Sequence, residues 1–244
     1  MTVRTHEAEL GLLCDAPLTV LGFLAEASNH TLLVQVGEKS DGMHAIYKPR
    51  SGERPLWDFP PGTLCRRETA AYAVSQFLGW DIVPPTVLRA GPMGTGSVQL
   101  FIPHDPVQHY FVLVEDARHH PALARMAVFD LLVNNADRKG SHVLLDGHGH
   151  IWGVDHGLTF HAQTKLRTVI WELGGTPLDP AWRADLLRLR AALHEPDDPL
   201  TARLGDLLSP PEVEVLGLRA GALAEASELP VVDERRRSYP WPPL

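Results

Sequence analysis

Four charged residues, Lys48, Glu68, Asp137 and Asp155, stand in an order that suits kinase-type phosphoryl transfer. That reaction needs a strand lysine on the α- and β-phosphates and a helix glutamate that holds the lysine. It also needs one loop carboxylate near the acceptor hydroxyl and a second carboxylate on a divalent cation. A single lysine at a strand end or a single glutamate on a helix is usually solvated. The order and spacing of all four favour a catalytic site.

The elements that must position Lys48 and Glu68 lie in the first third of the chain. Two β-type runs, over residues 31–36 and 44–48, are separated by turn residues, which predicts a hairpin with Lys48 at its end. Residues 66–78 carry apolar side chains at helical spacing, and the next residue is a glycine, a natural stop for a helix. Glu68 therefore lies on a predicted amphipathic helix.

A second predicted hairpin brings Asp137, His142 and Asp155 together. Apolar runs at 143–145 and 151–154 flank an Asp-Gly turn. With a loop of two to four residues, His142 lies opposite a residue between 151 and 153, and Asp155 follows on the partner strand. Two carboxylates at the open end of one hairpin suit a site that binds a divalent cation and supplies a base. The same Asp-Gly pair is also typical of an ordinary turn, which is the alternative.

The other segments indicate the fold class. We expect strands over residues 83–88 and 97–102, the first of them at the edge of a sheet because of its prolines. From residue 121 onward the pattern is helical, with one helix over 121–134. Two later helices of roughly 14 to 17 residues open at Pro180 and Pro210, each after a capping side chain.

This distribution of strands and helices predicts an α+β protein. We expect a β-rich N-terminal lobe over residues 1–102 and a helical C-terminal lobe over 103–244. The boundary falls near residue 103, where prolines interrupt both periodicities. The two lobes together are expected to form a single domain over residues 1–244, with a cleft between them.

Four motifs give the chain a resemblance to a known superfamily: Tyr47-Lys48-Pro49-Arg50, residues 96–102, Asn135-Ala-Asp137-Arg138, and residues 154–160. The sequence resembles the phosphatidylinositol 3- and 4-kinase-like superfamily. Its motifs are closest to those of the type II phosphatidylinositol 4-kinases and more distantly similar to those of HipA-type bacterial kinases. The resemblance covers residues 28–160, about half of the chain, and implies a two-lobed protein-kinase-like fold.

The resemblance also implies a role for each matching residue. Asp137 would be the catalytic carboxylate, and Asp155 would bind Mg²⁺. Lys48 would contact the ATP phosphates and Glu68 would orient it, while Phe101 and Ile102 would offer backbone groups to the adenine. Ser28 and Asn29 would stand in the loop that covers the phosphates, although this loop is not a G-x-G-x-x-G loop.

One position departs from the family pattern. Five residues after the catalytic aspartate the family has a metal-ligating asparagine, and this chain has His142. A neutral imidazole can bind a metal, but Mg²⁺ prefers oxygen. Either one metal suffices, or His142 contacts phosphate, or a softer ion such as Mn²⁺ is used. A fourth alternative is an ATP-binding pseudokinase that acts as a regulatory or scaffold module.

A third class of function is a metal-dependent hydrolase built on Asp137, Asp155 and the histidines. Lys48 and Glu68 would then have no role, which counts against it. We therefore expect an ATP- and divalent-cation-dependent phosphotransferase. The sequence leaves the acceptor open among a lipid, a protein and a small molecule.

The composition limits the partners and the compartment. Acidic residues outnumber basic residues 30 to 22, for a net charge of −8, which argues against a generic nucleic-acid partner. The two cysteines form no disulfide framework or metal motif, and there is no targeting segment, so we expect a soluble cytoplasmic protein. The sequence has no basic juxtamembrane run and no basic amphipathic helix, so we expect no stable membrane anchor.

Overall fold

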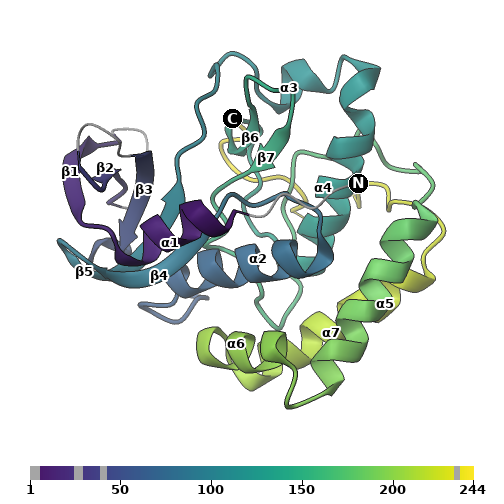
Figure 1. The fold of residues 1–244 in the computed structure, drawn as a ribbon. Helices are drawn as coiled ribbons and strands as arrows, with labels where there is room; N and C mark the ends of the chain where they lie inside the picture. Colours follow the sequence, from purple (N-terminus) through teal and green to yellow (C-terminus); the bar gives the residue numbers. More distant parts are fainter. Residues whose placement is uncertain (1–5, 25–29, 39–42, 234–236) are drawn as a thin grey trace.

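The computed structural model describes residues 6–24, 30–38, 43–233 and 237–244. An N-terminal antiparallel sheet with two helices is followed by a mostly helical C-terminal part, so the expected α+β fold class is confirmed (Figure 1). Within these described ranges, no helix has the length and apolar character that a membrane crossing requires.

The N-terminal part has five strands in the spatial order β1-β2-β3-β5-β4, and every neighbouring pair is antiparallel. Its elements are α1 (Glu7–Asp15), β1 (Leu18–Phe23), β2 (Leu32–Val36), β3 (Met43–Pro49), the 3₁₀ turn η1 (Arg50–Gly52), α2 (Leu64–Leu78), β4 (Thr86–Gly91) and β5 (Gly94–Leu100). The predicted hairpin is therefore confirmed. The strand predicted at a sheet edge over residues 83–88 is β4, which lies at the edge but begins three residues later, after the two prolines. The helix α1 and the strand β1 were not predicted.

The register of β3 places Lys48. Tyr47 pairs with Leu32 of β2 and is fully buried, whereas Lys48 pairs with Ser97 of β5. Because successive side chains of a strand point to opposite faces, a buried Tyr47 directs Lys48 to the other face of the sheet.

The helix α2 lies across the middle of the molecule, between the sheet and the C-terminal helices (Figure 1). It ends, as expected, at Gly79, whose left-handed φ of 69° closes the helix with backbone hydrogen bonds to the last turn. Both Arg67 and Glu68 of α2 are buried, so this helix carries charge into the interior of the protein.

The C-terminal part contains five helices and one short hairpin in the described residues. Its elements are α3 (Tyr110–Leu113), η2 (Ala117–His119), α4 (His120–Val133), η3 (Gly140–His142), β6 (Val143–Leu145), β7 (Ile151–Gly153), α5 (Pro180–His194), α6 (Pro199–Leu207) and α7 (Pro210–Glu225). The predicted helices at 121–134, Pro180 and Pro210 are confirmed. The helix α6 was not predicted, although Asp198 caps it just before a proline, as Asp179 caps α5.

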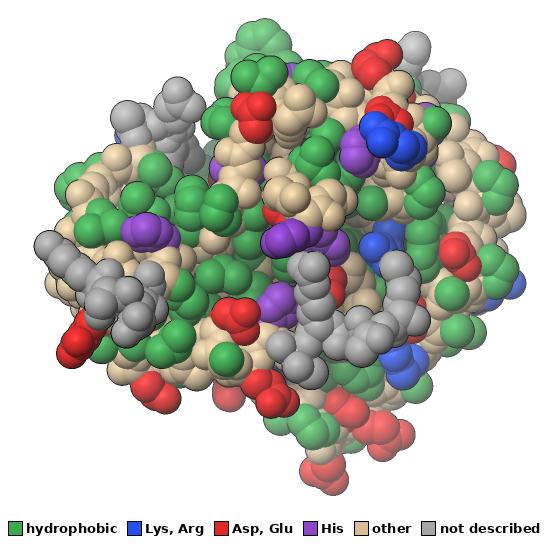
Figure 2. Space-filling model, turned by 45° about the horizontal axis from the view of Figure 1, so that its top comes forward, with side chains coloured by type: hydrophobic (Ala, Val, Ile, Leu, Met, Phe, Trp, Pro, Cys, Tyr) green, Lys and Arg blue, Asp and Glu red, His purple; other side chains and the backbone are tan. Residues whose placement is uncertain are grey.

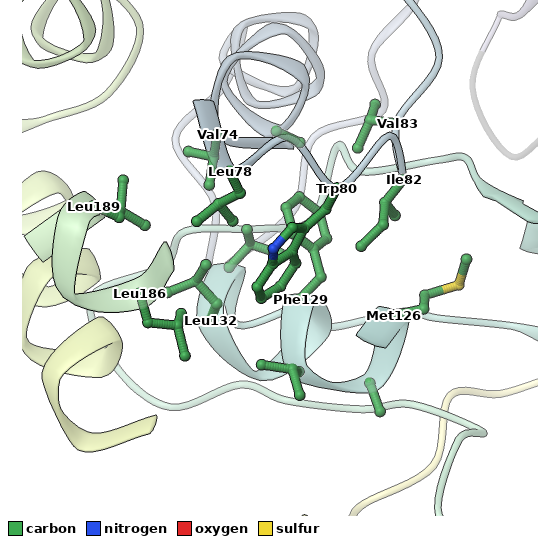
Figure 3. Close-up of a cluster of buried hydrophobic side chains, with 14 of the residues drawn as sticks. Val74, Leu78, Trp80, Ile82, Val83, Met126, Phe129, Leu132, Leu186 and Leu189 are labelled. Atoms are coloured by element: carbon green, nitrogen blue, oxygen red, sulfur yellow. The ribbon is translucent and has the colours of Figure 1, made fainter. Parts of the chain in front are cut away.

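The largest hydrophobic core joins the two parts. Trp80, just after α2, lies against Phe129 and Leu132 of α4, and Leu186 and Leu189 of α5 approach from the other side (Figure 3). A core shared by α2, α4 and α5 fixes α2, and with it Glu68, against the C-terminal part.

The second hairpin differs from the prediction by one residue. Val143 pairs with Gly153, so the residue opposite His142 is Val154 and not a residue between 151 and 153. The reason is the loop, which has five residues, from Asp146 to His150, because Asp146 accepts backbone bonds that stabilise a wider turn. Asp155 therefore comes directly after the residue opposite His142.

Candidate active site

Lys48 is the centre of a charged group formed by three separate segments. Its Nζ donates to Oδ1 of Asp155 at 2.8 Å and forms a short contact with Oε1 of Glu68. Lys48 comes from β3, Glu68 from α2 and Asp155 from the segment after β7. The fold thus brings together three of the residues that the sequence singled out.

The surroundings fix the charges of these groups. Burial lowers the pKa of the Lys48 ammonium, but the Asp155 and Glu68 carboxylates outweigh burial and raise that pKa above its usual range. Burial raises the pKa of Asp155, yet Lys48 reverses this effect and the carboxyl pKa lies below its ordinary value. Burial also raises the pKa of Glu68, and Lys48 offsets this effect in part.

Glu68 connects Lys48 to the backbone after Asp155. Its Oε2 accepts the N–H of His156 at 2.9 Å. Asp155 has a positive φ of 59°, a conformation that is uncommon for residues other than glycine and often occurs at functional sites. The bond from His156 to Glu68 holds this conformation from one side.

The loop between α4 and η3 presents Asp137 and Lys139. The backbone N–H of Asp137 donates to Oδ1 of Asn135 at 3.0 Å, which fixes the start of the loop. Lys139 Nζ lies 3.4 Å from Oδ2 of Asp137. Burial raises the pKa of Asp137, while Lys139 lowers it. Sequence analysis missed Lys139, although its place two residues after Asp137 was a signal.

A buried ion pair anchors this loop. Arg138 and Asp130 of α4 are both fully buried, with Nη2 of Arg138 2.9 Å from Oδ1 of Asp130. Arg138 also donates through Nη1 to the carbonyl of Val154 at 2.7 Å and through Nη2 to Nε2 of His156 at 2.7 Å. Arg138 therefore connects the loop of Asp137 to the segment of Asp155.

His142 lies beside Asp155, with its Nε2 3.4 Å from Oδ2 of that carboxylate. Its Nδ1 accepts the N–H of Lys139 at 3.4 Å. Burial lowers the pKa of His142 to about 4, so the ring is neutral near pH 7.

The residues proposed to contact adenine follow β5. Phe101 uses its N–H to donate to the carbonyl of His44 at 3.0 Å, and the carbonyl of Ile102 contacts Nδ1 of His104 at 2.8 Å. Ser28 and Asn29 lie outside the described residues, and the next residue, His30, donates its N–H to the carbonyl of Gly52.

A cavity of about 130 Å³ adjoins the charged group. It is lined by Lys48, Glu68, Asp137 and Asp155, which places all four charged residues of the sequence analysis around one space. His30, Glu53 and Arg54 also line this cavity, and sequence analysis missed the last two because they lie in an irregular segment.

Comparison with known proteins gives one relative in sequence. The chain is 38% identical to "Protein Rv2133c" of Mycobacterium tuberculosis over an alignment of 275 residues, which covers 99% of this chain and 97% of the relative. The chain belongs to the family of this protein. No protein-family model matches the chain.

In structure, the chain is similar to a proinflammatory kinase of Helicobacter pylori, CtkA. The TM-score is 0.48 and the identity 11%, and the match covers 88% of this chain and 94% of that chain. The resemblance of this chain to the type II phosphatidylinositol 4-kinases stays a prediction.

The side chains of Asp155 and His142 suit a divalent cation that binds together with phosphate groups. In the part of the chain that the structure describes, no cluster of three or more His, Cys, Asp or Glu side chains could hold a metal by itself. Mg²⁺ is commonly bound by one or two carboxylates together with substrate phosphates and water. Asp155 offers one half-exposed carboxylate of this kind, with His142 beside it.

One face of the protein agrees with the acidic composition. On the face that Figure 2 shows, Asp and Glu side chains occur at many separate places and outnumber Lys and Arg. Two basic side chains, Lys48 and Arg54, line the cavity of about 130 Å³.

Proposed function

We propose that this protein is an ATP- and divalent-cation-dependent phosphotransferase that moves the terminal phosphoryl group of ATP to a hydroxyl acceptor. The observation that carries the proposal is Lys48, held between Glu68 and Asp155 in a cavity that Asp137 also lines. An ammonium group fixed by two carboxylates, with a third carboxylate nearby, is the arrangement that phosphoryl transfer requires.

Lys48 would contact the α- and β-phosphates, and Glu68 would keep its side chain in place. Asp137 would accept the proton of the acceptor hydroxyl as the oxygen attacks phosphorus. The raised pKa of Asp137 suits this role, because a base whose pKa is closer to neutral accepts a proton more readily. Lys139, next to Asp137, would stabilise charge on the transferring phosphoryl group.

Asp155 would hold Mg²⁺ or Mn²⁺ together with the phosphates, and His142 would lie at the edge of this group. The cation would neutralise the charge that develops on the phosphate oxygens. Because Asp155 already bonds to Lys48, it can present its second oxygen to a cation while the lysine stays in position.

The adenine would lie near Phe101 and Ile102, between the two lobes of a single kinase-like domain. Since the N–H of Phe101 is already bonded, the N–H of Ile102 is the donor that we propose for the base. By the resemblance, Ser28 and Asn29 would stand in the loop that covers the phosphates.

His142 favours a second candidate function. If the imidazole at the position of the usual asparagine prevents transfer, the protein would be an ATP-binding pseudokinase with a regulatory or scaffold role. This alternative keeps every nucleotide contact and removes only the chemistry.

Turnover of labelled ATP with Mg²⁺ or Mn²⁺ tests the proposal. We expect ATP hydrolysis or autophosphorylation by the wild type, and a fall of about 100-fold or more for Asp137→Asn, the usual contribution of a positioned base. The matched control is Asp116→Asn, an exposed carboxylate outside the site, which should leave turnover unchanged. If the wild type binds ATP tightly but shows no turnover with either cation, the enzyme is rejected and the pseudokinase is favoured.

A further inference from the structure

A second and larger cavity adjoins the catalytic one. It has a volume of about 540 Å³ and lies between the segment over residues 50–64 and the turn that connects β4 to β5. Four residues line both cavities, Glu53, Arg54, Leu56 and Leu64, so the two spaces are neighbours with a common wall.

The position of this cavity along β5 separates it from the proposed adenine site. Thr95, near the start of β5, lines the cavity, while Lys48 pairs with Ser97 in the middle of the strand. Phe101 follows the end of the same strand, six residues from Thr95, or about 20 Å at 3.3 Å per residue. The larger cavity therefore lies on the far side of Lys48 from the adenine.

The wall of the larger cavity combines apolar surface with positive charge. Phe59, Leu64, Met93 and several prolines supply the apolar part. Arg50 and Arg54 supply two guanidinium groups. Among the described residues of the wall, Glu53 is the one carboxylate, and it accepts the N–H of Cys65 at 3.1 Å. In a chain of net charge −8, two guanidinium groups beside one carboxylate among these described residues favour an anionic ligand.

The guanidinium of Arg50 lies against the backbone of Gly62. Gly62 has a φ of +76°, in the left-handed region that favours glycine, and the Nε of Arg50 lies where a Cβ at this position would be. The hydroxyl of Ser51 donates to the carbonyl of Met93 at 3.0 Å, which ties the segment after β3 to the β4–β5 turn. The Arg50 guanidinium thus lies at one wall of the cavity.

We propose that the larger cavity binds the phosphoryl acceptor, a small hydroxylated molecule with an apolar body and a carboxylate or phosphate group. Arg50 and Arg54 bind the anionic group, and the hydroxyl enters the catalytic cavity beside Asp137. This proposal rests on the proposed phosphotransferase function. A volume of about 540 Å³ is within the usual range for sites that bind small molecules.

Fluorescence titration with anilinonaphthalene sulfonate, an anionic apolar probe, tests the binding site without knowledge of the acceptor. We expect Arg50→Ala and Arg54→Ala each to weaken binding about tenfold, as expected for loss of a charge-assisted hydrogen bond. Thr95→Trp, which fills the cavity, should abolish binding. Arg118→Ala, an exposed arginine elsewhere, should have no effect. Phenylnaphthylamine, an uncharged probe of similar shape, should bind equally to the wild type and to the arginine variants.

The anion site is overturned if probe binding is the same in the wild type, Arg50→Ala, Arg54→Ala and Thr95→Trp. It is also overturned if ATP with Mg²⁺ displaces the probe, because the cavity would then be part of the nucleotide site. The soluble acceptor is overturned if vesicles of anionic phosphatidylglycerol sediment with the wild type and not with Arg50→Ala.

A separate measurement distinguishes failure of this proposal from failure of the proposed function. In the wild type and Arg50→Ala, the rise of melting temperature with ATP and Mg²⁺ reports on the nucleotide site, because Arg50 lines the larger cavity and not the catalytic one. If Arg50→Ala binds the probe more weakly but keeps the normal rise of melting temperature with ATP, the result supports both the acceptor site and the phosphotransferase function. If probe binding depends on the arginines but ATP does not change the melting temperature of the wild type, the cavity is an anion site and the protein is not a phosphotransferase. The acceptor role of the cavity is then rejected as well.

Discussion

Lys48 and Asp155 lie 107 residues apart in the chain and are joined by a hydrogen bond of 2.8 Å. Glu68 contacts the same ammonium group, so one lysine connects the sheet, the helix α2 and the segment after β7. The site is therefore assembled across the two parts of the fold, and its charges depend on each other.

This coupling has a measurable effect on stability. Glu68 is 3% exposed, and Lys48→Met would leave its carboxylate buried without the ammonium. We expect Lys48→Met to lower the free energy of unfolding by about 3 kcal/mol, the lower end for a broken buried pair. In a double-mutant cycle with Glu68→Gln, urea unfolding should give a coupling energy of about 1 kcal/mol or more. If the effects of the two changes on the free energy of unfolding are additive, the interaction of Lys48 with Glu68 does not contribute to stability.

The buried pair of Arg138 and Asp130 should be a larger source of stability. Both side chains are fully buried, and Arg138 also bonds to the carbonyl of Val154. Arg138→Met is expected to cost about 3–5 kcal/mol in urea unfolding, because an unpaired carboxylate remains inside the protein. Arg118→Met, which removes an exposed arginine, should leave the unfolding midpoint unchanged. Equal midpoints for the two variants would contradict the role of Arg138 as an anchor.

The pH dependence of turnover should report on Asp137. A general base must be unprotonated, so activity falls as pH drops through its pKa, and burial places that pKa above the usual carboxyl value. Lys139 lowers the pKa of Asp137, and Lys139→Met should therefore move the acidic limb of the kcat profile to higher pH. Lys165→Met should not move it, because Lys165 pairs with Asp58 instead. A shift to lower pH in Lys139→Met would refute the assignment of this limb to Asp137.

His142 should make stability depend on pH. Its pKa is about 4 in the folded protein and about 6.5 in the unfolded chain, so between these values the unfolded state binds more protons. The free energy of unfolding should therefore decrease as pH falls from 6.5 to 4, with a slope from this group of at most about 1.4 kcal/mol per pH unit. His142→Asn should flatten the dependence, whereas His148→Asn, in an exposed turn, should not. An identical slope in all three proteins would show that His142 is not buried in its neutral form.

The positions of Lys48, Glu68 and Asp155 could be predicted from the sequence because each follows from a local pattern. A β-type run placed Lys48 at the end of a strand, helical spacing placed Glu68, and the Asp-Gly hairpin placed Asp155 near Asp137. The register was wrong by one residue because Asp146 accepts backbone bonds within its turn, and the side-chain pattern of the strands does not reveal such bonds.

The walls of the cavities could not be predicted in the same way. Glu53 and Arg54 lie in an irregular segment without periodicity, and their position depends on tertiary contacts such as the bond from Ser51 to Met93. The role of Arg138 was hidden for a similar reason. Its partners Asp130 and Val154 come from different elements, and only the folded chain brings them together.

The most direct test of the central claim is calorimetric titration with ATP, in Mg²⁺ and in a chelator, for the wild type, Asp155→Asn and the control Asp116→Asn. We expect the wild type and Asp116→Asn to bind ATP more tightly with Mg²⁺, because in the proposed function Asp155 would hold the cation against the phosphates. Asp155→Asn should lose this difference. Absence of ATP binding by the wild type in both conditions, or an unchanged Mg²⁺ dependence in Asp155→Asn, would contradict the nucleotide site formed by Lys48, Glu68 and Asp155.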